Sequence, residues 1–496
     1  MVVCNQSETL PTTIPKTIPG RETKMKKKII ASLLSVAMVS ALLTGCGSGA
    51  ATTQEGEAKT ESVKADTQTT ADIASTGGKV YMLNFKPEID DQWKALAEKY
   101  TEQTGVEVTI LTAADGQYST TLQSEMAKSE APTIFNIGST TDAQTWNDYT
   151  YDLANSELYK HLTDKSLAVE YDGKVAAVAN CYECYGIIYN KTILEDYCTV
   201  DGAVISSVDD IKDFDTLKAV CEDINGRVDE INDALGTELT EAFASSGLDD
   251  GSSWRFSGHL AGIELYYEFL DDGCDLIAGE AEIKGKYLDN FKNVWDLYTN
   301  TSAANKATLT SGTYNAEMEL GMGEAVFYQN GDWEYSAFNN PDNGYIVTGD
   351  DIAMMPIYFG VDDANEGLAL GTENHWAVNA KAPQEDIDAT LAFLEWVITS
   401  DDGRDAITNE MGLSAPFDTF TGEYASSNKL AACANDYAAA GKTSVAWSFN
   451  ATPNVDDWRA DVVAGLVEYT CNGGDYTAVE DAFVSGWADQ WQLAHE

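Results

Sequence analysis

Strand-like and helix-like segments alternate at the start of the apolar-rich part of the chain, and this order limits the fold more than any other feature. Residues 80–85 form a short apolar strand, and residues 90–103 form an amphipathic helix with apolar side chains at helical spacing. Gly105 follows this helix as a stop signal, and further strands are expected at 106–110 and 132–137. A strand–helix–strand opening predicts the α/β class, with a parallel sheet covered by helices on both faces.

The same alternation returns later in the chain. An apolar strand at 325–328 leads into a turn at Asn330-Gly331 and then a helix. A strand at 376–379 leads into a helix whose apolar stripe spans residues 387–398, and two more helices are expected towards the C-terminus.

Composition bounds the size of the fold and the class of partner. The chain has 496 residues, 44% hydrophobic and 10% aromatic, which allows two or three domains with large cores. Its 81 acidic and 30 basic side chains give a net charge of −51. Because so acidic a surface repels phosphate backbones and anionic lipid headgroups, nucleic acid is not an expected partner, nor is a polybasic membrane-surface role expected.

A targeting segment lies near the N-terminus. Lysines at 26–28 precede an apolar run at 29–43 that is too short for a permanent spanning helix. The run ends in Leu43-Thr44-Gly45-Cys46, which resembles the lipobox of bacterial lipoproteins; a plain secretory signal that contains a cysteine is the alternative. The resemblance implies cleavage before Cys46, lipidation of its thiol, and attachment to the outer face of the cell membrane through this anchor alone.

The segments around the lipobox set the expected boundaries. Residues 1–24 do not fit a signal peptide and are interpreted as an over-called extension before a true start at Met25. Residues 25–45 are then the signal peptide. Residues 46–78 carry no aromatic side chain and are rich in small and polar residues, which predicts a flexible tether after the lipidated cysteine.

Five local motifs follow one another in the rest of the chain. They are Thr104-Gly105-Val106-Glu107-Val108, Ala131-Pro132-Thr133-Ile134-Phe135, Tyr171-Asp172-Gly173-Lys174 with Tyr185-Gly186-Ile187-Ile188-Tyr189-Asn190-Lys191, Asn330-Gly331-Asp332-Trp333, and Phe393-Leu394-Glu395-Trp396 with Thr399-Ser400-Asp401-Asp402-Gly403. Each is short, but in this order and behind a lipobox they resemble the extracellular solute-binding proteins of carbohydrate ABC importers, a family that includes the maltose-binding proteins. The second motif departs from the family, because Thr133 stands where relatives carry Asp.

This resemblance implies a periplasmic-binding-protein-like fold, in which two α/β lobes joined by a hinge close over a ligand in the cleft between them. The expected N-terminal lobe comprises residues 79–183 and 373–417, and the C-terminal lobe residues 184–372 and 418–496. Three crossings between the lobes are expected, near 181–186, near 371–376 and shortly after Phe417. The resemblance also implies a monomer that captures a sugar or oligosaccharide and delivers it to the importer's permease subunits.

Sugar recognition requires aromatic rings for the C–H face and carboxylates or amides for the hydroxyls. Trp333 follows a buried strand by one tight turn, and the family carries a sugar-stacking Trp in this motif; a core Trp at a helix start is the alternative. Relatives also place ligand contacts near Glu183, in the loop of Trp254, and at a C-terminal Trp matched by Trp458, which lies on an apolar helix stripe as well. The expected ligand-binding residues are Lys86, Glu88, Asn136, Glu183, Trp254, Asp332, Trp333, Asn374 and Trp458.

For two of these residues the sequence leaves a second interpretation open. A solvated strand edge is the alternative for Glu183, and a helix cap is the alternative for Asp332. Asn136 stands where a maltose binder carries Trp, so the sugar selected is left open.

Other chemistries find little support in the sequence. The pair Cys181-x-x-Cys184 lies in a segment expected to be extended, whereas thioredoxin-like pairs open a helix. Seven cysteines remain beside Cys4 and Cys46, an odd number that leaves at least one thiol free or paired outside the chain. The four scattered His residues lack metal-ligand spacing, and no P-loop or G-x-S-x-G motif occurs, so no metal, cofactor or catalytic residue is expected.

The prediction is therefore a binding protein rather than an enzyme. The alternatives are a secreted lipoprotein glycosidase, or a binding protein for a polyamine or a peptide.

Overall fold

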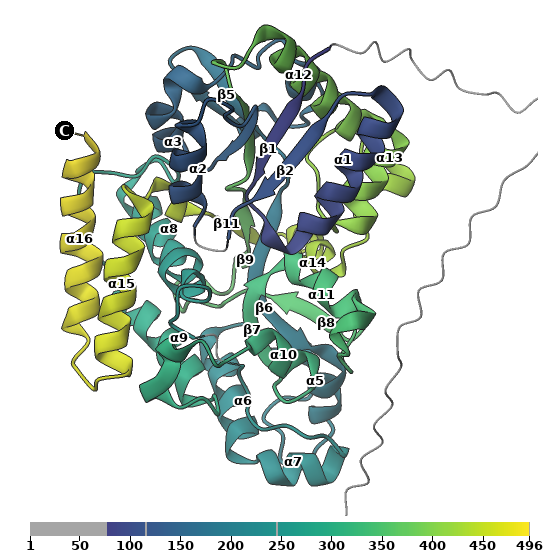
Figure 1. The fold of residues 1–496 in the computed structure, drawn as a ribbon. Coiled ribbons are helices and arrows are strands. Elements are labelled where there is room, and N and C mark those ends of the chain that lie inside the picture. Colours follow the sequence, from purple (N-terminus) through teal and green to yellow (C-terminus); the bar gives the residue numbers. More distant parts are fainter. Residues whose placement is uncertain (1–76, 115–116, 245–246, 496) are drawn as a thin grey trace, which may run out of the picture. The chain divides into compact units, whose positions relative to one another are not determined.

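The computed structural model describes residues 77–114, 117–244 and 247–495, all within one compact unit, Thr70–Glu496. Figure 1 shows its strands gathered in two sheets with helices around them. The expected extension 1–24, the signal peptide 25–45, Cys46 and nearly all of the tether 46–78 lie outside the described residues. None of the described helices is both long and apolar enough to cross a membrane.

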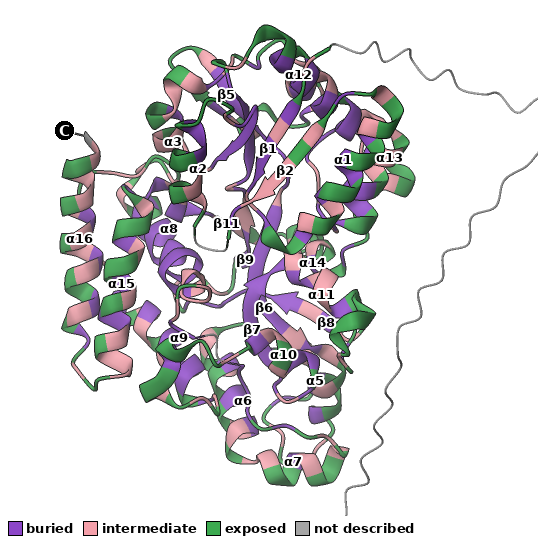
Figure 2. Ribbon diagram, viewed as in Figure 1, coloured by how far each residue is buried: buried purple, intermediate pink, exposed green. Residues whose placement is uncertain are grey.

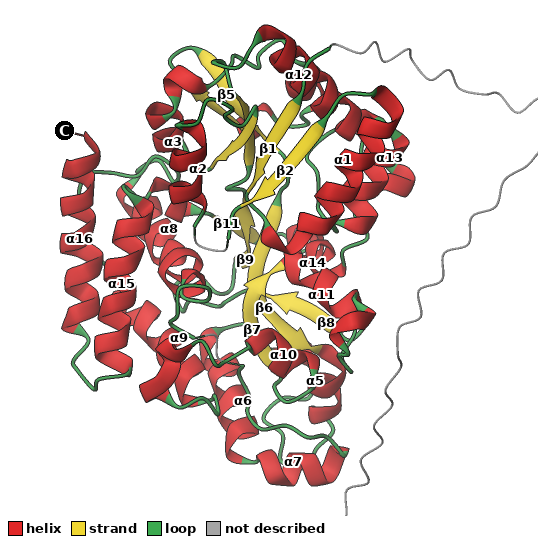
Figure 3. Ribbon diagram, viewed as in Figure 1, coloured by secondary structure: helices red, strands yellow, loops and turns green. Residues whose placement is uncertain are grey.

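The strands and helices alternate as the sequence predicts (Figure 3). The strands are β1 (Val80–Asn84), β2 (Val108–Thr112), β3 (Ile134–Ile137), β4 (Ala168–Tyr171), β5 (Lys174–Ala179), β6 (Glu183–Asn190), β7 (Phe327–Gly331), β8 (Ile352–Met355), β9 (Glu366–Gly371), β10 (His375–Val378) and β11 (Thr443–Ala446). The helices are α1 (Asp90–Thr104), α2 (Tyr118–Met126), α3 (Thr140–Thr145), α4 (Glu157–His161), α5 (Lys191–Tyr197), α6 (Phe214–Gly226), α7 (Val228–Leu235), α8 (Ala261–Asp272), α9 (Leu288–Asn300), α10 (Ala316–Gly321), α11 (Tyr335–Asn339), α12 (Gln384–Thr399), α13 (Asp401–Asp405), α14 (Lys429–Ala439), α15 (Val455–Thr470) and α16 (Thr477–His495).

Six strands form the first sheet, in the order β2-β1-β3-β10-β5-β4. β1 pairs in parallel with β2 and β3, as the strand–helix–strand opening predicts. β10 lies antiparallel between β3 and β5, so the expectation of a parallel sheet is wrong beyond the first three strands. The reason is connectivity, because β10 comes back from the second sheet instead of following a helical crossover on this one.

The second sheet has the order β11-β9-β6-β7, and β8 also pairs with β6. β6 is antiparallel to β7, β8 and β9, while β9 and β11 run in parallel. The strand expected at 325–328 continues to Gly331, so Gly331 is a strand residue and not part of a turn. A short 3-10 turn, η7 (Asp332–Glu334), follows it directly and leads into α11.

Three segments carry the chain between the two sheets. The chain leaves the first sheet after Ala179 and enters the second at Glu183. It returns between Gly371 and His375. The last passage lies between Phe417 and β11. Phe417 forms an isolated bridge with Leu162, while β11 belongs to the second sheet.

The inner strands of each sheet are buried on both faces, whereas the edge strands β2, β4 and β11 are partly exposed. On β1, Met82 packs into a core with Trp93, whereas Leu83 packs into another core on the opposite face. On β6, Ile187 and Ile188 divide in the same way between the two cores of the second sheet. Figure 2 shows buried residues on most strands, intermediate and exposed ones on β2, and exposed residues on the outer faces of the helices.

The loop between β1 and α1 is held by strong local signals. A 3-10 turn, η1 (Pro87–Ile89), begins with Pro87 and precedes α1, which has acidic residues in its first turn. α1 ends at Gly105, whose φ of 75° is the left-handed cap that glycine adopts without strain. The predicted helix over 90–103 is confirmed, and the loop before it carries Lys86 and Glu88.

All seven cysteines in the described residues are free thiols. Cys184 is the second residue of β6 and Cys181 precedes that strand, so the pair does not open a helix. Burial raises the pKa of both thiols well above the usual value, which keeps them protonated and poorly reactive.

Candidate functional site

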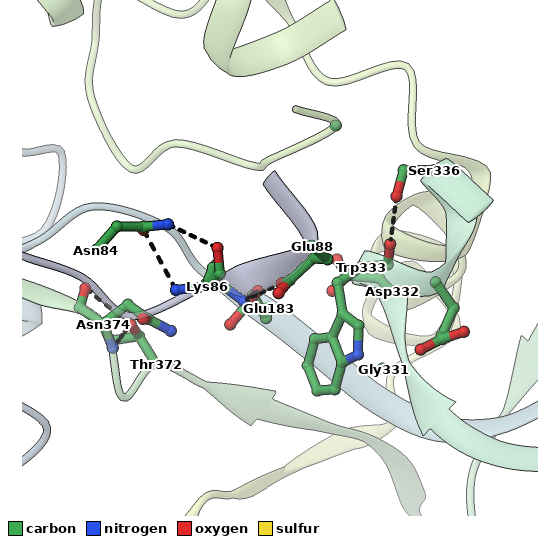
Figure 4. A network of polar contacts seen from close by, with 12 residues as sticks. Asn84, Lys86, Glu88, Glu183, Gly331, Asp332, Trp333, Ser336, Thr372 and Asn374 are labelled. Atoms are coloured by element: carbon green, nitrogen blue, oxygen red, sulfur yellow. Dashed lines mark hydrogen bonds and ion pairs between the residues drawn. The ribbon is translucent and has the colours of Figure 1, made fainter. Parts of the chain in front are cut away.

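A buried ion pair connects the first sheet to the second. Lys86 lies in the loop after β1, and its Nζ is 2.7 Å from Oε1 of Glu183, the first residue of β6. The same Nζ is 3.3 Å from Oε1 of Glu88, whose side chain is partly exposed. Figure 4 shows the two carboxylates directed at the Lys86 ammonium.

Both partners of this ion pair are removed from water, with 9% of the Lys86 side chain and 3% of the Glu183 side chain exposed. Burial disfavours the ammonium, but the charges of Glu183 and Glu88 outweigh it and raise the pKa of Lys86 well above its ordinary value. Lys86 therefore stays charged at neutral pH. Asn84 fixes the loop, because its Nδ2 donates to Lys86 O at 2.6 Å and its Oδ1 accepts from Lys86 N at 3.2 Å.

Trp333 approaches the ion pair from the second sheet. It lies in η7, and Lys86 Nζ is 5.2 Å from its ring centroid, within cation–π range. The ring packs against the backbone of Gly331, where a Cβ would fall 2.1, 2.2 and 2.4 Å from three ring carbons. Only a residue without a side chain fits beneath the ring in this position, which gives the Gly of the Asn-Gly-x-Trp motif a packing role.

Asp332 lies between Gly331 and Trp333 and is 3% exposed. Burial, followed by the charge of Glu183, raises the pKa of the Asp332 carboxyl well above its ordinary value. A protonated carboxyl is a donor as well as an acceptor, which suits a ligand hydroxyl. The Asp332 carbonyl accepts a hydrogen bond from Asn428 Nδ2 at 2.8 Å, which ties η7 to the start of α14.

Five rings from distant parts of the chain pack around one histidine. We call these six residues the aromatic cluster: Tyr185, Trp254, His259, Trp333, Trp447 and Phe449. His259 stacks on Tyr185, with centroids 4.0 Å apart and ring planes 7° apart. The Trp333 centroid lies 5.8 Å from that of Tyr185 and 5.9 Å from those of Trp254 and His259. Trp447 and Phe449 meet His259 edge-on, at 4.8 and 4.7 Å.

A π-helical turn positions part of this cluster. The turn η5 (Arg255–Leu260) follows Trp254 directly and continues into α8. Such turns are rare and occur frequently at functional sites. Burial, then the charges of Arg459, Arg255 and Lys86, lower the pKa of His259 well below its ordinary value, so its ring is neutral at pH 7. Its Nδ1 is buried and has no hydrogen-bond partner among the residues that the structure describes.

The passage between β9 and β10 carries a buried amide. Asn374 is 1% exposed, and neither its Oδ1 nor its Nδ2 has a hydrogen-bond partner within residues 77–114, 117–244 or 247–495. Its backbone is held firmly, since its N–H donates to Thr372 Oγ1 at 3.1 Å and its carbonyl accepts from Asn180 N at 3.0 Å (Figure 4). Because buried amides are nearly always paired, Asn374 is suited to a polar group from outside the chain.

The structure brings six of the nine expected residues together. These are Lys86, Glu88, Glu183, Trp254, Asp332 and Trp333. Asn374 lies in the passage beside them (Figure 4). Asn136 is a buried residue of β3 whose Oδ1 also has no partner in the described part of the chain.

Trp458 does not belong to this group, and the expectation that it contacts ligand is wrong. Its side chain is fully buried, and its Nε1–H donates to Phe483 O at 3.0 Å. Its ring meets Phe483 and Trp487 of α16 at centroid distances of 4.8 and 5.6 Å. Trp458 lies on the apolar stripe of α15 that packs against α16, so core packing decides its place.

Sequence reasoning missed the residues that only tertiary packing brings to the site. They are Tyr185, Arg255, His259, Trp447, Phe449 and Arg459. Arg255 Cζ is 4.3 Å from the Trp254 ring, and Arg459 Cζ is 5.2 Å from the Phe449 ring. One signal was available: two of the five arginines in the chain directly follow a tryptophan singled out above, Trp254 or Trp458. Trp447 and Phe449 gave no comparable signal.

The comparison with solved structures reveals the same fold in sugar-binding proteins. RafE in complex with raffinose has a TM-score of 0.60 and 15% sequence identity, covering 84% of this chain and 99% of its own. The GacH receptor of Streptomyces glaucescens, with a TM-score of 0.58 and 16% identity, covers 84% of this chain and 98% of its own. A chitin oligosaccharide binding protein has a TM-score of 0.59 and 14% identity, covering 84% of this chain and 97% of its own.

No curated protein matches the chain in sequence. The sequence does match a protein family over residues 95–432, which is more than half of the chain and includes every strand of the two sheets except β1 and β11. That family is described as bacterial extracellular solute-binding protein. The two-sheet architecture and the sequence match agree, and the chain therefore belongs to the bacterial extracellular solute-binding proteins.

Proposed function

We propose that this protein captures a sugar or oligosaccharide outside the cell and delivers it to the permease subunits of an ABC importer. The observation that carries the proposal is the aromatic cluster beside the Lys86–Glu183 ion pair. Rings of this kind cover the C–H face of a pyranose, while charged and amide groups at their edge take its hydroxyls. Trp333 supplies such a ring and the adjacent Asp332 a carboxyl, and Asn374 supplies an amide from the passage between β9 and β10.

Structural relatives support a sugar ligand. RafE is described with raffinose, GacH with acarbose, and a third relative as binding chitin oligosaccharide. The charges at the cluster speak against the polyamine alternative, because Lys86, Arg255 and Arg459 would repel a polycation.

We further propose that the ligand is enclosed by two lobes that close about the passages between the sheets. The N-terminal lobe comprises residues 79–183 and 373–417, and the C-terminal lobe residues 184–372 and 418–496. Support comes from Lys86 of the N-terminal lobe, which pairs with Glu183 at the lobe boundary and contacts the ring of Trp333 in the C-terminal lobe. A ligand bound among these side chains would touch groups from both lobes and so favour the closed arrangement.

We also propose that the protein acts as a monomer and that lipidated Cys46 holds it at the outer face of the cell membrane. Cys46→Ser is expected to release the protein or leave its precursor unprocessed, because the thiol is the acceptor of the lipid. Metabolic labelling with a fatty acid checks this, and label that persists in the variant contradicts the anchor.

A titration with neutral and acidic di- and trisaccharides tests the proposed function. A ligand at one hundred times its Kd is expected to stabilise the fold by about 2.7 kcal/mol and to be recovered intact by chromatography. Trp333→Ala serves as the variant that loses the shift. Cleaved products would favour the glycosidase alternative, and the absence of a thermal shift with every sugar would contradict sugar capture.

A further inference from the structure

Two of the four arginines in the described residues form no ion pair with a carboxylate there. Arg227 pairs with Asp223 and Glu230, and Arg404 pairs with Asp401. Arg255 and Arg459 have no carboxylate within 4 Å in the described part of the chain. Two arginines at the aromatic cluster thus lack an ion-pair partner among the described residues, although the sequence has 81 acidic and 30 basic side chains.

Both guanidinium groups lie on rings at the aromatic cluster. Arg255 Cζ is 4.3 Å from the Trp254 ring, and its Nη2 donates to Tyr328 OH at 3.2 Å. Arg459 Cζ is 5.2 Å from the Phe449 ring. Each Nε–H is buried and finds no acceptor among the described residues. Arg255 already uses its other donors, since its Nη1 also donates to the carbonyls of Gly251 and Ser252, each at 3.4 Å, so only its Nε–H is left without an acceptor in the described part of the chain. The Phe449 ring holds the Arg459 guanidinium in place, and this guanidinium is the one whose planar donors can serve a ligand.

The two arginines meet at one turn of backbone. Arg255 begins the π-helical turn η5, and Arg459 reaches the same turn from α15. The Arg459 Nη2 lies 3.0 Å from the position that a Cβ on Gly258 would take, so the guanidinium rests on that glycine. His259 follows Gly258, and it experiences the positive charges of Arg459, Arg255 and Lys86 together.

Two buried acidic residues face this positive group, Glu334 on the side of Arg255 and Glu373 on the side of Arg459. Burial raises the pKa of Glu334 to about 8, although the charge of Arg255 opposes this. The charge of Arg459 favours ionised Glu373, but burial is the larger effect and raises the pKa of that carboxyl overall. Glu373 forms no ion pair with Arg459 within 4 Å. Lys86 differs from both arginines, because Glu183 already pairs with it.

We propose that the ligand is an acidic oligosaccharide, whose sugar ring stacks on the aromatic cluster and whose carboxylate binds Arg459, with Arg255 adding to the positive charge on the same side. This inference rests on the proposed function and specifies the class of sugar. A guanidinium presents parallel N–H donors to a planar carboxylate, a geometry that a neutral sugar does not use fully.

Matched pairs of ligands test the inference. Digalacturonate, cellobiouronate and sialyllactose are each titrated beside their methyl esters, which keep the ring and remove the charge; raffinose and maltotriose serve as neutral sugars. At least one acid is expected to bind tenfold or more tightly than its ester, with an affinity that falls as salt is added. Arg459→Gln is expected to weaken binding of that acid tenfold to a hundredfold and binding of its ester less than threefold.

Arg404→Gln is the matched control, because Arg404 also stacks on a ring, that of Tyr424 at 4.0 Å, yet is paired with a carboxylate. It should leave both affinities unchanged. Arg459→Lys keeps the positive charge but not the parallel N–H donors of the guanidinium, and it should retain part of the preference for the acid over its ester.

Each other outcome decides against the inference. Esters or neutral sugars that bind as tightly as the acids overturn it while the proposed function stands. Equal weakening of acid and ester by Arg459→Gln reduces Arg459 to a packing residue. Succinate binding as tightly as the acidic sugars would mean that no sugar ring is required. If none of these compounds binds, the proposed function fails as well.

Discussion

Replacing Gly331 with alanine is expected to weaken ligand binding without unfolding the protein. Gly331 is the last residue of β7, with φ −96° and ψ 174°, an extended conformation that alanine adopts without strain. The new Cβ would lie 2.1 Å from the nearest carbon of the Trp333 ring. Since carbon atoms approach comfortably to only about 3.5–4.0 Å, the ring must move by more than 1 Å, roughly.

The magnitude follows from what the displaced ring supplies. Loss of one stacked aromatic contact in a binding site removes roughly 2–4 kcal/mol, the range of binding hot spots. Affinity should therefore fall about thirtyfold to a thousandfold, since each 1.4 kcal/mol corresponds to about tenfold. Stability should change little, because Gly→Ala in an allowed conformation stabilises by about 0.4–1 kcal/mol and offsets part of the disturbed packing.

Calorimetry with the sugar that gives the largest thermal shift, together with a thermal melt, measures both quantities. Gly226→Ala is the control, because no atom lies within 4 Å of the Cβ that it would add. Binding by Gly331→Ala within twofold of the parent would refute a stacking role for Trp333. A sharply lowered melting point with unchanged affinity would mean that the ring belongs to the core.

Three further predictions concern stability. Lys86→Met should lower the free energy of unfolding by about 3–5 kcal/mol in urea titrations, because Glu183 is left buried without its cation; a loss below 1 kcal/mol, roughly, would contradict this. Burial raises the pKa of Glu264 to about 8, so the stabilisation it contributes is complete below pH 4.5 and is lost as pH rises to about 8. Unfolding free energies measured from pH 5 to 8 should fall, by at most about 1.4 kcal/mol per pH unit for this group, and Glu264→Gln should flatten the profile. Trp458→Phe removes the hydrogen bond to Phe483 and should cost about 1–3 kcal/mol of stability while leaving the affinity of the protein that still folds unchanged.

Much of the fold could be predicted because apolar periodicity records burial. The helix over 90–103 was clear because it buries one repeating set of side chains, and the strand at 80–85 was clear because it is a short apolar run buried on both faces. Apolar periodicity does not show whether a strand runs parallel or antiparallel to its neighbours. The sequence of β10 is as apolar as that of β3, although the two run antiparallel.

The residues of the candidate site also differ in whether the sequence alone could predict them. Lys86 and Trp333 could be expected near the candidate site because each follows a strand, where loops from a sheet gather, and Glu183 because the resemblance implied a ligand contact there. Trp458 was misjudged because its apolar helical stripe, which indicates core packing, was weighed too lightly against its resemblance to a ligand-stacking Trp. His259 could not be foreseen, since its neighbours come from β6, η7 and the segment after β11, and no local pattern brings these together.

The place of β10 has a consequence for how the protein matures. This strand fills the centre of the first sheet, between β3 and β5, although both of those strands leave the ribosome long before it does. Until β10 arrives, β3 and β5 expose unpaired edges, and their sheet cannot close. Such distant pairings slow folding and delay it until most of the chain has been made. For a protein of an extracellular family, the first sheet therefore cannot be completed until residues 375–378 are available.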